Sequence, residues 1–140
     1  MGYCLSSTGE FAAARPWFER AVAAAEKGDV HGRVDHAGLG QSLHQVGYCL
    51  SSLGEFAAAR TRYERAVAAQ EKGDVHGRVD HAGLGRSLHQ VGYCLGSTGE
   101  FAAARAWYER AVAAKEKGDV YGRVDHESLA LTIRAIQDLG

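Results

Sequence analysis

Histidine and aspartate recur at a spacing that suits a metal site. Asp29, His31 and His36 return 45 residues later with the same residue types, but the third occurrence has Tyr121 in place of the first histidine. A zinc site needs three or four ligands held at fixed geometry, so two histidines and one aspartate in a single loop are only suggestive. We therefore expect no metal and no other cofactor, with His36 in the first turn of a helix and His31 facing water. Zinc binding is the alternative.

The three cysteines, Cys4, Cys49 and Cys94, are also 45 residues apart and could form a metal or redox cluster. The explanation that we favour is a small buried side chain at a helix–helix contact. Equivalent residues of stacked helices lie roughly 10 Å apart, whereas a disulfide requires Cα atoms within about 7 Å. We expect free thiols, which fit a reducing compartment such as the cytoplasm.

Catalytic machinery is not evident in the sequence. No combination of Ser, His and Asp stands outside the repeating pattern, and no glycine-rich loop resembles a phosphate-binding motif. Glu19, Glu64 and Glu109 are each followed by an arginine, which predicts a solvated helix face with local charge pairing. We expect that the protein is not an enzyme.

The composition is that of a folded domain with balanced charge. Hydrophobic residues make up 46% of the 140 residues, which is enough for a core, and the length suits a single domain over residues 1–140. The formal net charge of -1 argues against a nucleic-acid-binding surface or a basic membrane patch. The sequence has no apolar run of about 20 residues and no secretory signal at its start. We expect neither nucleic acid nor membrane as a partner.

An internal repeat organises the chain. The string Gly-Tyr-Cys-Leu occurs at residues 2–5, 47–50 and 92–95, so the period is 45 residues. The three repeats are 2–46, 47–91 and 92–136. The first two differ at only six positions, which are Thr8/Leu53, Pro16/Thr61, Trp17/Arg62, Phe18/Tyr63, Ala25/Gln70 and Gln41/Arg86. Copies this similar are either recently duplicated or built from a consensus.

The hydrophobic pattern within one repeat predicts two helices. Leu84, Leu88, Val91 and Leu95 lie four, three and four residues apart on one helix face, and Asp80 before them suits an N-cap. Glycines end each run, and no alternating β-branched segment predicts a strand. The predicted helices are 1–8, 10–27, 36–53, 55–72, 81–98, 100–117 and 126–139. Stacked hairpins bury both apolar faces, so we expect an all-α protein, an α-solenoid of three helix–turn–helix repeats with a C-terminal half-repeat helix.

The motif in each repeat resembles the tetratricopeptide repeat (TPR) family. In the second repeat its characteristic positions are Val46-Gly47, Gly54, Phe56, Ala59, Tyr63 and Ala66. The usual period of the family is about 34 residues, whereas the 45-residue period here places additional residues in the connector to the next repeat. In this respect the chain resembles the long repeats of kinesin light chains and of bacterial signalling proteins.

The resemblance implies a scaffold that binds a protein or a peptide. In TPR arrays the first helix of each repeat lines a concave groove, and the implied groove residues lie off the apolar stripe, which independently predicts that they are exposed. These residues are Tyr3, Gln41, His44, Gln45, Tyr48, Ser52, Arg86, His89, Gln90, Tyr93, Ser97 and Arg134. Tyrosine is favoured at recognition surfaces. The alternatives are a solubilising face and a designed or fragmentary structural array with no ligand of its own.

The repeat frame also predicts a contact between copies of the chain. Residues 2–9 correspond to the second half of a first helix, and residues 126–136 correspond to the first half of one. The C-terminal half-helix of one molecule can therefore complete the N-terminal half-helix of another, which gives weak head-to-tail self-association. A monomer in which residues 126–139 cap the array is the alternative.

Overall fold

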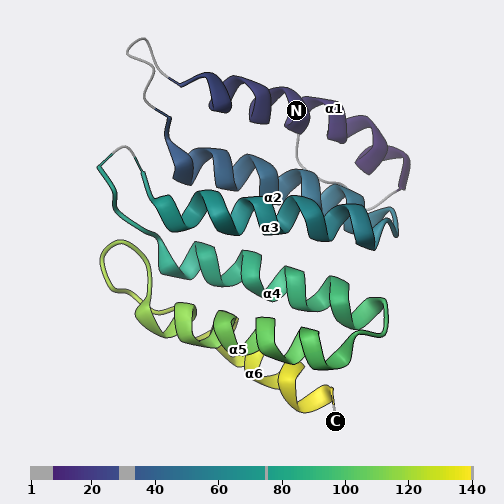
Figure 1. Cartoon of the computed structure of the whole chain (residues 1–140), viewed down its shortest axis with the longest axis vertical. Coiled ribbons are helices and arrows are strands. Elements are labelled where there is room, and N and C mark those ends of the chain that lie inside the picture. Colours follow the sequence, from purple (N-terminus) through teal and green to yellow (C-terminus); the bar gives the residue numbers. More distant parts are fainter. Residues whose placement is uncertain (1–7, 29–33, 75, 140) are drawn as a thin grey trace.

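The computed structural model describes residues 8–28, 34–74 and 76–139, which form helices stacked in chain order along the long axis of the molecule (Figure 1). The helices are α1 (Thr8–Lys27), α2 (His36–Ser52), α3 (Phe56–Lys72), α4 (His81–Ser97), α5 (Phe101–Lys117) and α6 (His126–Asp138). The described ranges contain no strand. The all-α solenoid predicted from the repeat is therefore confirmed.

The predicted helix bounds agree with those of α1 to α6 to within two residues at each end. The largest difference is at the start of α1, which begins at Thr8 rather than at residue 10. Of the helix predicted over 1–8, residues 1–7 lie outside the described ranges. Helix α1 continues through Pro16, whose ring nitrogen cannot donate a hydrogen bond to the Ala12 carbonyl.

Aspartate side chains begin the first helix of each hairpin. Asp35, Asp80 and Asp125 accept hydrogen bonds from the backbone N–H groups three residues further on, at 3.1, 3.0 and 3.1 Å. Each carboxylate satisfies a helix N–H that has no partner within the helix. The N-cap predicted at Asp80 is confirmed, and the first histidine of each of these helices lies in the first turn.

A glycine–tyrosine contact joins the two helices of each hairpin. Gly47 on α2 faces the ring of Tyr63 on α3, and a Cβ atom at Gly47 would lie only 2.9 Å from the ring. Gly92 and Tyr108 repeat this contact between α4 and α5. Because glycine has no side chain, the helices approach closely and Tyr63 becomes fully buried. A hydrophobic core then runs across the repeats from Val22 in α1 as far as the last turn of α5.

An aspartate holds each of the connectors that follow α3 and α5. The Asp74 carboxylate accepts hydrogen bonds from the backbone N–H groups of His76 and Arg78 and from the Arg78 guanidinium, at 2.8, 3.0 and 2.8 Å. These bonds, the Arg78 N–H first, lower the pKa of Asp74. The Gly73 carbonyl accepts a hydrogen bond from Ala37 N–H at 3.0 Å, which ties the end of α3 to the start of α2. Asp74 thus serves the loop itself, and His76 is exposed.

No group of three or more His, Cys, Asp and Glu side chains gathers in the part of the chain that the structure describes. Asp29 and His31 lie outside that part. Cys49 and Cys94 are buried in the core, as expected, and Cys4 lies outside the described ranges. Burial raises the pKa of the Cys94 thiol to about 11, so it is protonated at neutral pH. None of the described helices has the length and apolarity needed to cross a membrane.

Ion pairs connect the second helices of successive repeats. Arg65 on α3 pairs with Glu26 on α1 at 3.0 Å, and Arg110 on α5 pairs with Glu71 on α3 at 3.6 Å. The predicted pairing within each helix is therefore only part of the pattern, because these arginines reach back to the preceding repeat. Exposed pairs of this kind are individually weak. The two pairs join equivalent positions of successive repeats, so they mark the common register of the second helices.

Candidate functional site

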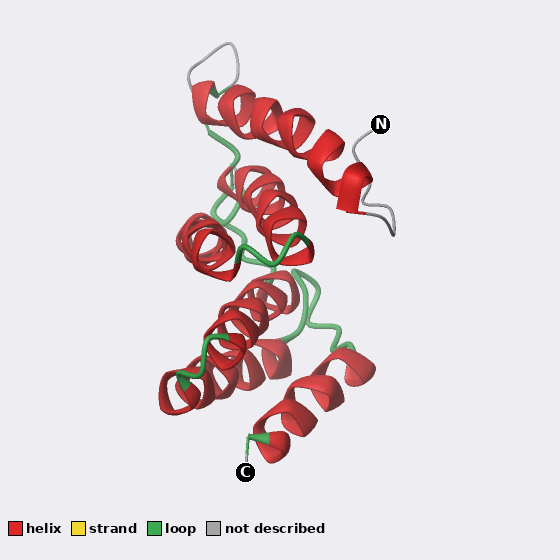
Figure 2. Cartoon of the chain, turned by 90° about the vertical axis from the view of Figure 1, so that its right-hand side faces the viewer, coloured by secondary structure: helices red, strands yellow, loops and turns green. Residues whose placement is uncertain are grey.

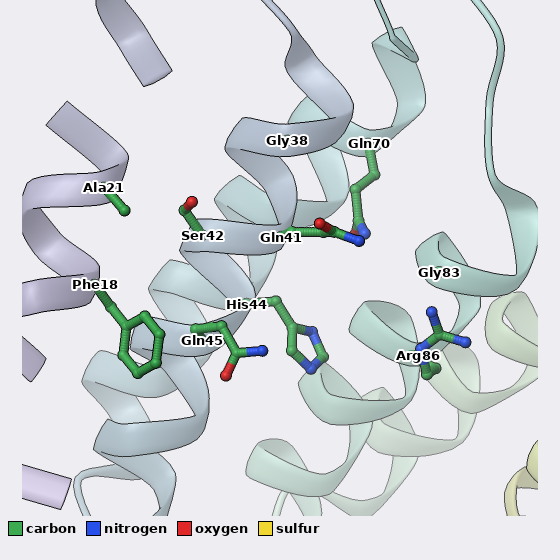
Figure 3. A pocket seen from close by; sticks show the side chains of 10 residues that line it. All are labelled: Phe18, Ala21, Gly38, Gln41, Ser42, His44, Gln45, Gln70, Gly83 and Arg86. Atoms are coloured by element: carbon green, nitrogen blue, oxygen red, sulfur yellow. The ribbon is translucent and has the colours of Figure 1, made fainter. Parts of the chain in front are cut away.

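A cavity of about 450 Å³ lies between the first helices of two successive repeats, where α1 and α3 add further walls (Figure 3). It is lined by Phe18, Ala21, Gly38, Gln41, Ser42, His44, Gln45, Gln70, Gly83 and Arg86. Gln41, His44, Gln45 and Arg86 were implied by the resemblance, and the structure brings these four together. The cavity is therefore built mainly of amide, imidazole, hydroxyl and guanidinium groups.

His44 connects two repeats. Its Nδ1 lies 3.0 Å from Ser87 Oγ on α4, and its ring packs edge-on against Tyr63 at a centroid distance of 5.1 Å. Burial, and then the charge of Arg86, lower the pKa of His44 to about 4. The imidazole is therefore neutral at pH 7 and offers one donor and one acceptor.

His89 repeats this arrangement one repeat further along. Its Nδ1 lies 2.8 Å from Thr132 Oγ1 on α6, and its ring contacts Tyr108 at 5.0 Å. Burial, and then the charge of Lys115, lower its pKa to about 4. The prediction that His44 and His89 are exposed is wrong, because both side chains are half-buried between neighbouring helices. A helical wheel of one helix does not include the helix stacked beside it.

Gln70 was not among the implied residues, because it lies on α3, a second helix of a hairpin. Its side chain crosses α2 at Gly40, where a Cβ atom would lie 2.4 Å from Gln70 Cγ. Gln70 is 9% exposed, and its Oε1 has no hydrogen-bond partner. Figure 3 shows its amide beside that of Gln41. One feature of the sequence could have pointed to Gln70, because position 70 is one of the six at which the first two repeats differ.

The equivalent of Gln70 in the next repeat is Lys115, which is 4% exposed. Its Nζ donates hydrogen bonds to the Ser128 carbonyl at 2.9 Å and to Thr132 Oγ1 at 2.6 Å, both on α6. Burial, and then the charge of Arg86, lower the pKa of Lys115 to about 8. The cavity beside it is only about 170 Å³. Arg86 also lines this cavity, where it stands at the position equivalent to Gln41, and Leu131 stands at the position equivalent to Arg86 of the larger cavity.

The other implied residues lie away from the larger cavity. Tyr48 and Tyr93 are 42% and 46% exposed in the fourth turn of their helices, and Tyr93 packs edge-on against Phe56 at 6.0 Å. Gln90 is half-buried and lines the smaller cavity. Ser52 is half-buried, whereas Ser97 and Arg134 are exposed. Tyr3 lies outside the described residues.

Comparison with protein families identifies the repeat. Residues 1–72 match a family model described as tetratricopeptide repeat, and residues 85–117 match a second model with the same description. No curated protein matches the chain. The first match covers half of the sequence, and the stacked helical hairpins agree with it. The chain therefore belongs to the tetratricopeptide repeat family.

Proposed function

We propose that the protein is a non-enzymatic scaffold that binds a protein or peptide through the concave face formed by α2, α4 and α6. Tetratricopeptide repeats generally mediate protein–protein interactions. The observation that carries the proposal is the polar cavity of about 450 Å³ between α2 and α4. Further along both helices, tyrosines are exposed at equivalent positions. The cytoplasm is the proposed location, since Cys94 is a free thiol.

A binding experiment tests this proposal through the two tyrosines. Peptides are selected from a random phage-displayed library on the wild-type protein, and their affinities are measured by calorimetry. Replacing both Tyr48 and Tyr93 by alanine is expected to weaken binding by at least about 30-fold, because truncating an interface tyrosine costs about 2 kcal/mol or more. Both side chains are substantially exposed, so the circular dichroism spectrum should not change.

The matched control is Trp17→Ala, which removes an exposed aromatic side chain on α1 away from the cavity lining. This variant should bind the selected peptides with wild-type affinity. Equal affinity of the wild-type protein and of the double tyrosine variant would contradict the assignment of the binding face.

We also propose that the 140-residue chain associates weakly head to tail. Ile133 on α6 is 41% exposed, whereas its equivalent Leu88 on α4 is 3% exposed. Ala21 on α1 is exposed, whereas its equivalent Ala66 on α3 is fully buried. Helices α1 and α6 are the outermost described helices of the stack (Figure 2). A neighbouring copy would cover the face of α6 that carries Ile133 and the face of α1 that carries Ala21. Within the chain, the adjacent helix of the stack covers the equivalent faces of α4 and α3.

Light scattering at about millimolar protein is expected to detect this association, since contacts of roughly 4 kcal/mol become populated there. Ile133→Lys should abolish it. The register of the Arg65–Glu26 and Arg110–Glu71 pairs would place Arg20 of one copy beside Glu116 of the next. Arg20→Glu should therefore weaken the association, and mixing this variant with Glu116→Arg should restore it. A monomeric wild-type mass at that concentration would contradict the proposal.

A further inference from the structure

We propose that the cavity between α2 and α4 is a subsite for one uncharged carboxamide of the bound peptide, and that Gln70 determines this selectivity. The occupant we infer is the side chain of Asn or Gln. This inference rests on the proposed function, because it names the chemistry that one part of the binding face recognises.

The first argument is the unsatisfied acceptor in the cavity wall. Gln70 Oε1 has no hydrogen-bond partner although the residue is 9% exposed. Buried polar atoms are nearly always paired, and an unpaired one is unfavourable. The side chain reaches the cavity only because Gly40 leaves room for it to cross α2. A bound group that donates a hydrogen bond at this wall would satisfy Oε1.

The second argument is the equivalent site one repeat further along. There Lys115 extends past α4, and its Nζ donates to the Ser128 carbonyl and to Thr132 on α6. The side chain itself thus fills the space between successive first helices, and the cavity is about 170 Å³ instead of about 450 Å³. Gln70 is shorter and uncharged. The two sites share a backbone framework and differ in the chemistry that they offer to a ligand.

The third argument is the combination of charges and donors around the larger cavity. The Arg86 guanidinium donates but cannot accept, and His44 is neutral. An ammonium group can donate to Gln70 Oε1 but meets the positive charge of Arg86. A carboxylate can accept from Arg86 but leaves Oε1 without a donor. A carboxamide does both, since its NH₂ group donates and its oxygen accepts, and Phe18 offers apolar surface to its aliphatic stem.

The control substitution is Gln70→Lys, which introduces the residue found at the equivalent position of the next repeat. Lys115 occupies the equivalent position in a folded repeat beside Gly85, so the variant is expected to fold, and circular dichroism checks this. In the variant, the new ammonium group is expected to donate to Ser87 and to the Gly83 carbonyl, which are the equivalents of the Lys115 acceptors. It should therefore close the cavity without changing the tyrosines of the binding face.

The test is a parallel selection from the random phage-displayed library on the wild-type protein and on Gln70→Lys. We expect Asn or Gln at one fixed position of the wild-type peptides and no such preference on the variant. Replacing that residue by Glu or by Lys in a selected peptide should lower its affinity for the wild-type protein at least about tenfold, because a buried partner then stays unpaired. The same replacements should change the affinity for Gln70→Lys much less.

The outcomes separate this inference from the proposed function. Peptides that bind both proteins equally, or that carry an acidic residue at the fixed position, would overturn the carboxamide subsite and leave the scaffold function intact. A loss of affinity in Gln70→Lys without any side-chain preference would overturn the Asn or Gln side chain as the occupant and would point to a peptide group of the backbone instead. Failure to select any peptide would overturn both proposals.

Discussion

Replacing Tyr63 by alanine is expected to lower the free energy of unfolding by about 3–5 kcal/mol, since a fully buried aromatic side chain is removed. The ring fills the space between α2 and α3, where it faces Gly47 and the edge of His44. Truncation leaves a cavity in the core that is continuous across the repeats. Urea denaturation followed by circular dichroism measures the change. Phe101→Ala, at a residue that is 56% exposed, is the control and should change stability by less than about 0.5 kcal/mol.

A double-mutant cycle makes the contact itself testable. Gly47→Ala alone should destabilise the protein, because its Cβ would lie 2.9 Å from the Tyr63 ring. In the Tyr63→Ala background the same substitution should become neutral or stabilising, since the ring is absent and alanine favours a helix by about 1 kcal/mol over glycine. Additive effects of the two substitutions would show that Gly47 and Tyr63 do not constrain each other.

Acidification from pH 7 to pH 4.5 is expected to destabilise the protein through His44 and His89. Both have a pKa of about 4 in the folded state against 6.5 for the free side chain. The unfolded state therefore binds more protons between these values, and stability falls as the pH drops from 6.5 toward 4. A shift of this size corresponds to roughly 3 kcal/mol for each imidazole. Arg86 and Lys115 contribute to it, because their positive charges oppose protonation of the neighbouring histidine.

The measurement is a series of urea titrations across this pH range. The His44→Gln and His89→Gln double variant should lose most of the dependence, whereas His76→Gln should keep it, because His76 is exposed. The lowered pKa values of Asp74 and Asp119 stabilise the folded protein above the unfolded-state pKa of 3.8. This contribution is lost mainly as the pH falls through 3.8 and below, where the unfolded state takes up protons first. A wild-type stability that does not change between pH 6.5 and 4.5 would contradict the burial of the two imidazoles as neutral groups.

The helices were predictable because their determinants are local. The spacing of Leu84, Leu88 and Val91 defines one buried face, and Asp80 accepts the hydrogen bond that starts the helix. Glycines with positive φ angles, such as Gly99 at 85°, end the helices where the hydrophobic pattern stops. The repeat then determines how the hairpins stack, since each must bury the same face. Helix bounds consequently differ from the prediction by two residues at most.

The site was less predictable because it forms between repeats. His44 lies off the apolar stripe of its own helix, yet Ser87 from the next repeat and Tyr63 from α3 bury it. Gln70 belongs to a second helix, which a groove assignment based on first helices leaves out. Its contribution depends on Gly40, thirty residues earlier in the chain, which leaves the space that the side chain crosses. The hydrophobic periodicity of a single helix predicts neither the burial of His44 by neighbouring helices nor the crossing of Gln70 over Gly40.

The glycine–tyrosine contacts also have a mechanical consequence. They lie within the hairpins α2–α3 and α4–α5, whose contacts are more extensive than those between successive hairpins. The hairpins are joined to one another by the smaller part of the hydrophobic core that continues between them, by exposed ion pairs and by the His44 and His89 hydrogen bonds. A molecule stretched from its two ends should therefore yield first between hairpins, and each hairpin should then unravel as a unit. Every such step would lengthen the molecule by roughly 150 Å, the extended length of one 45-residue repeat.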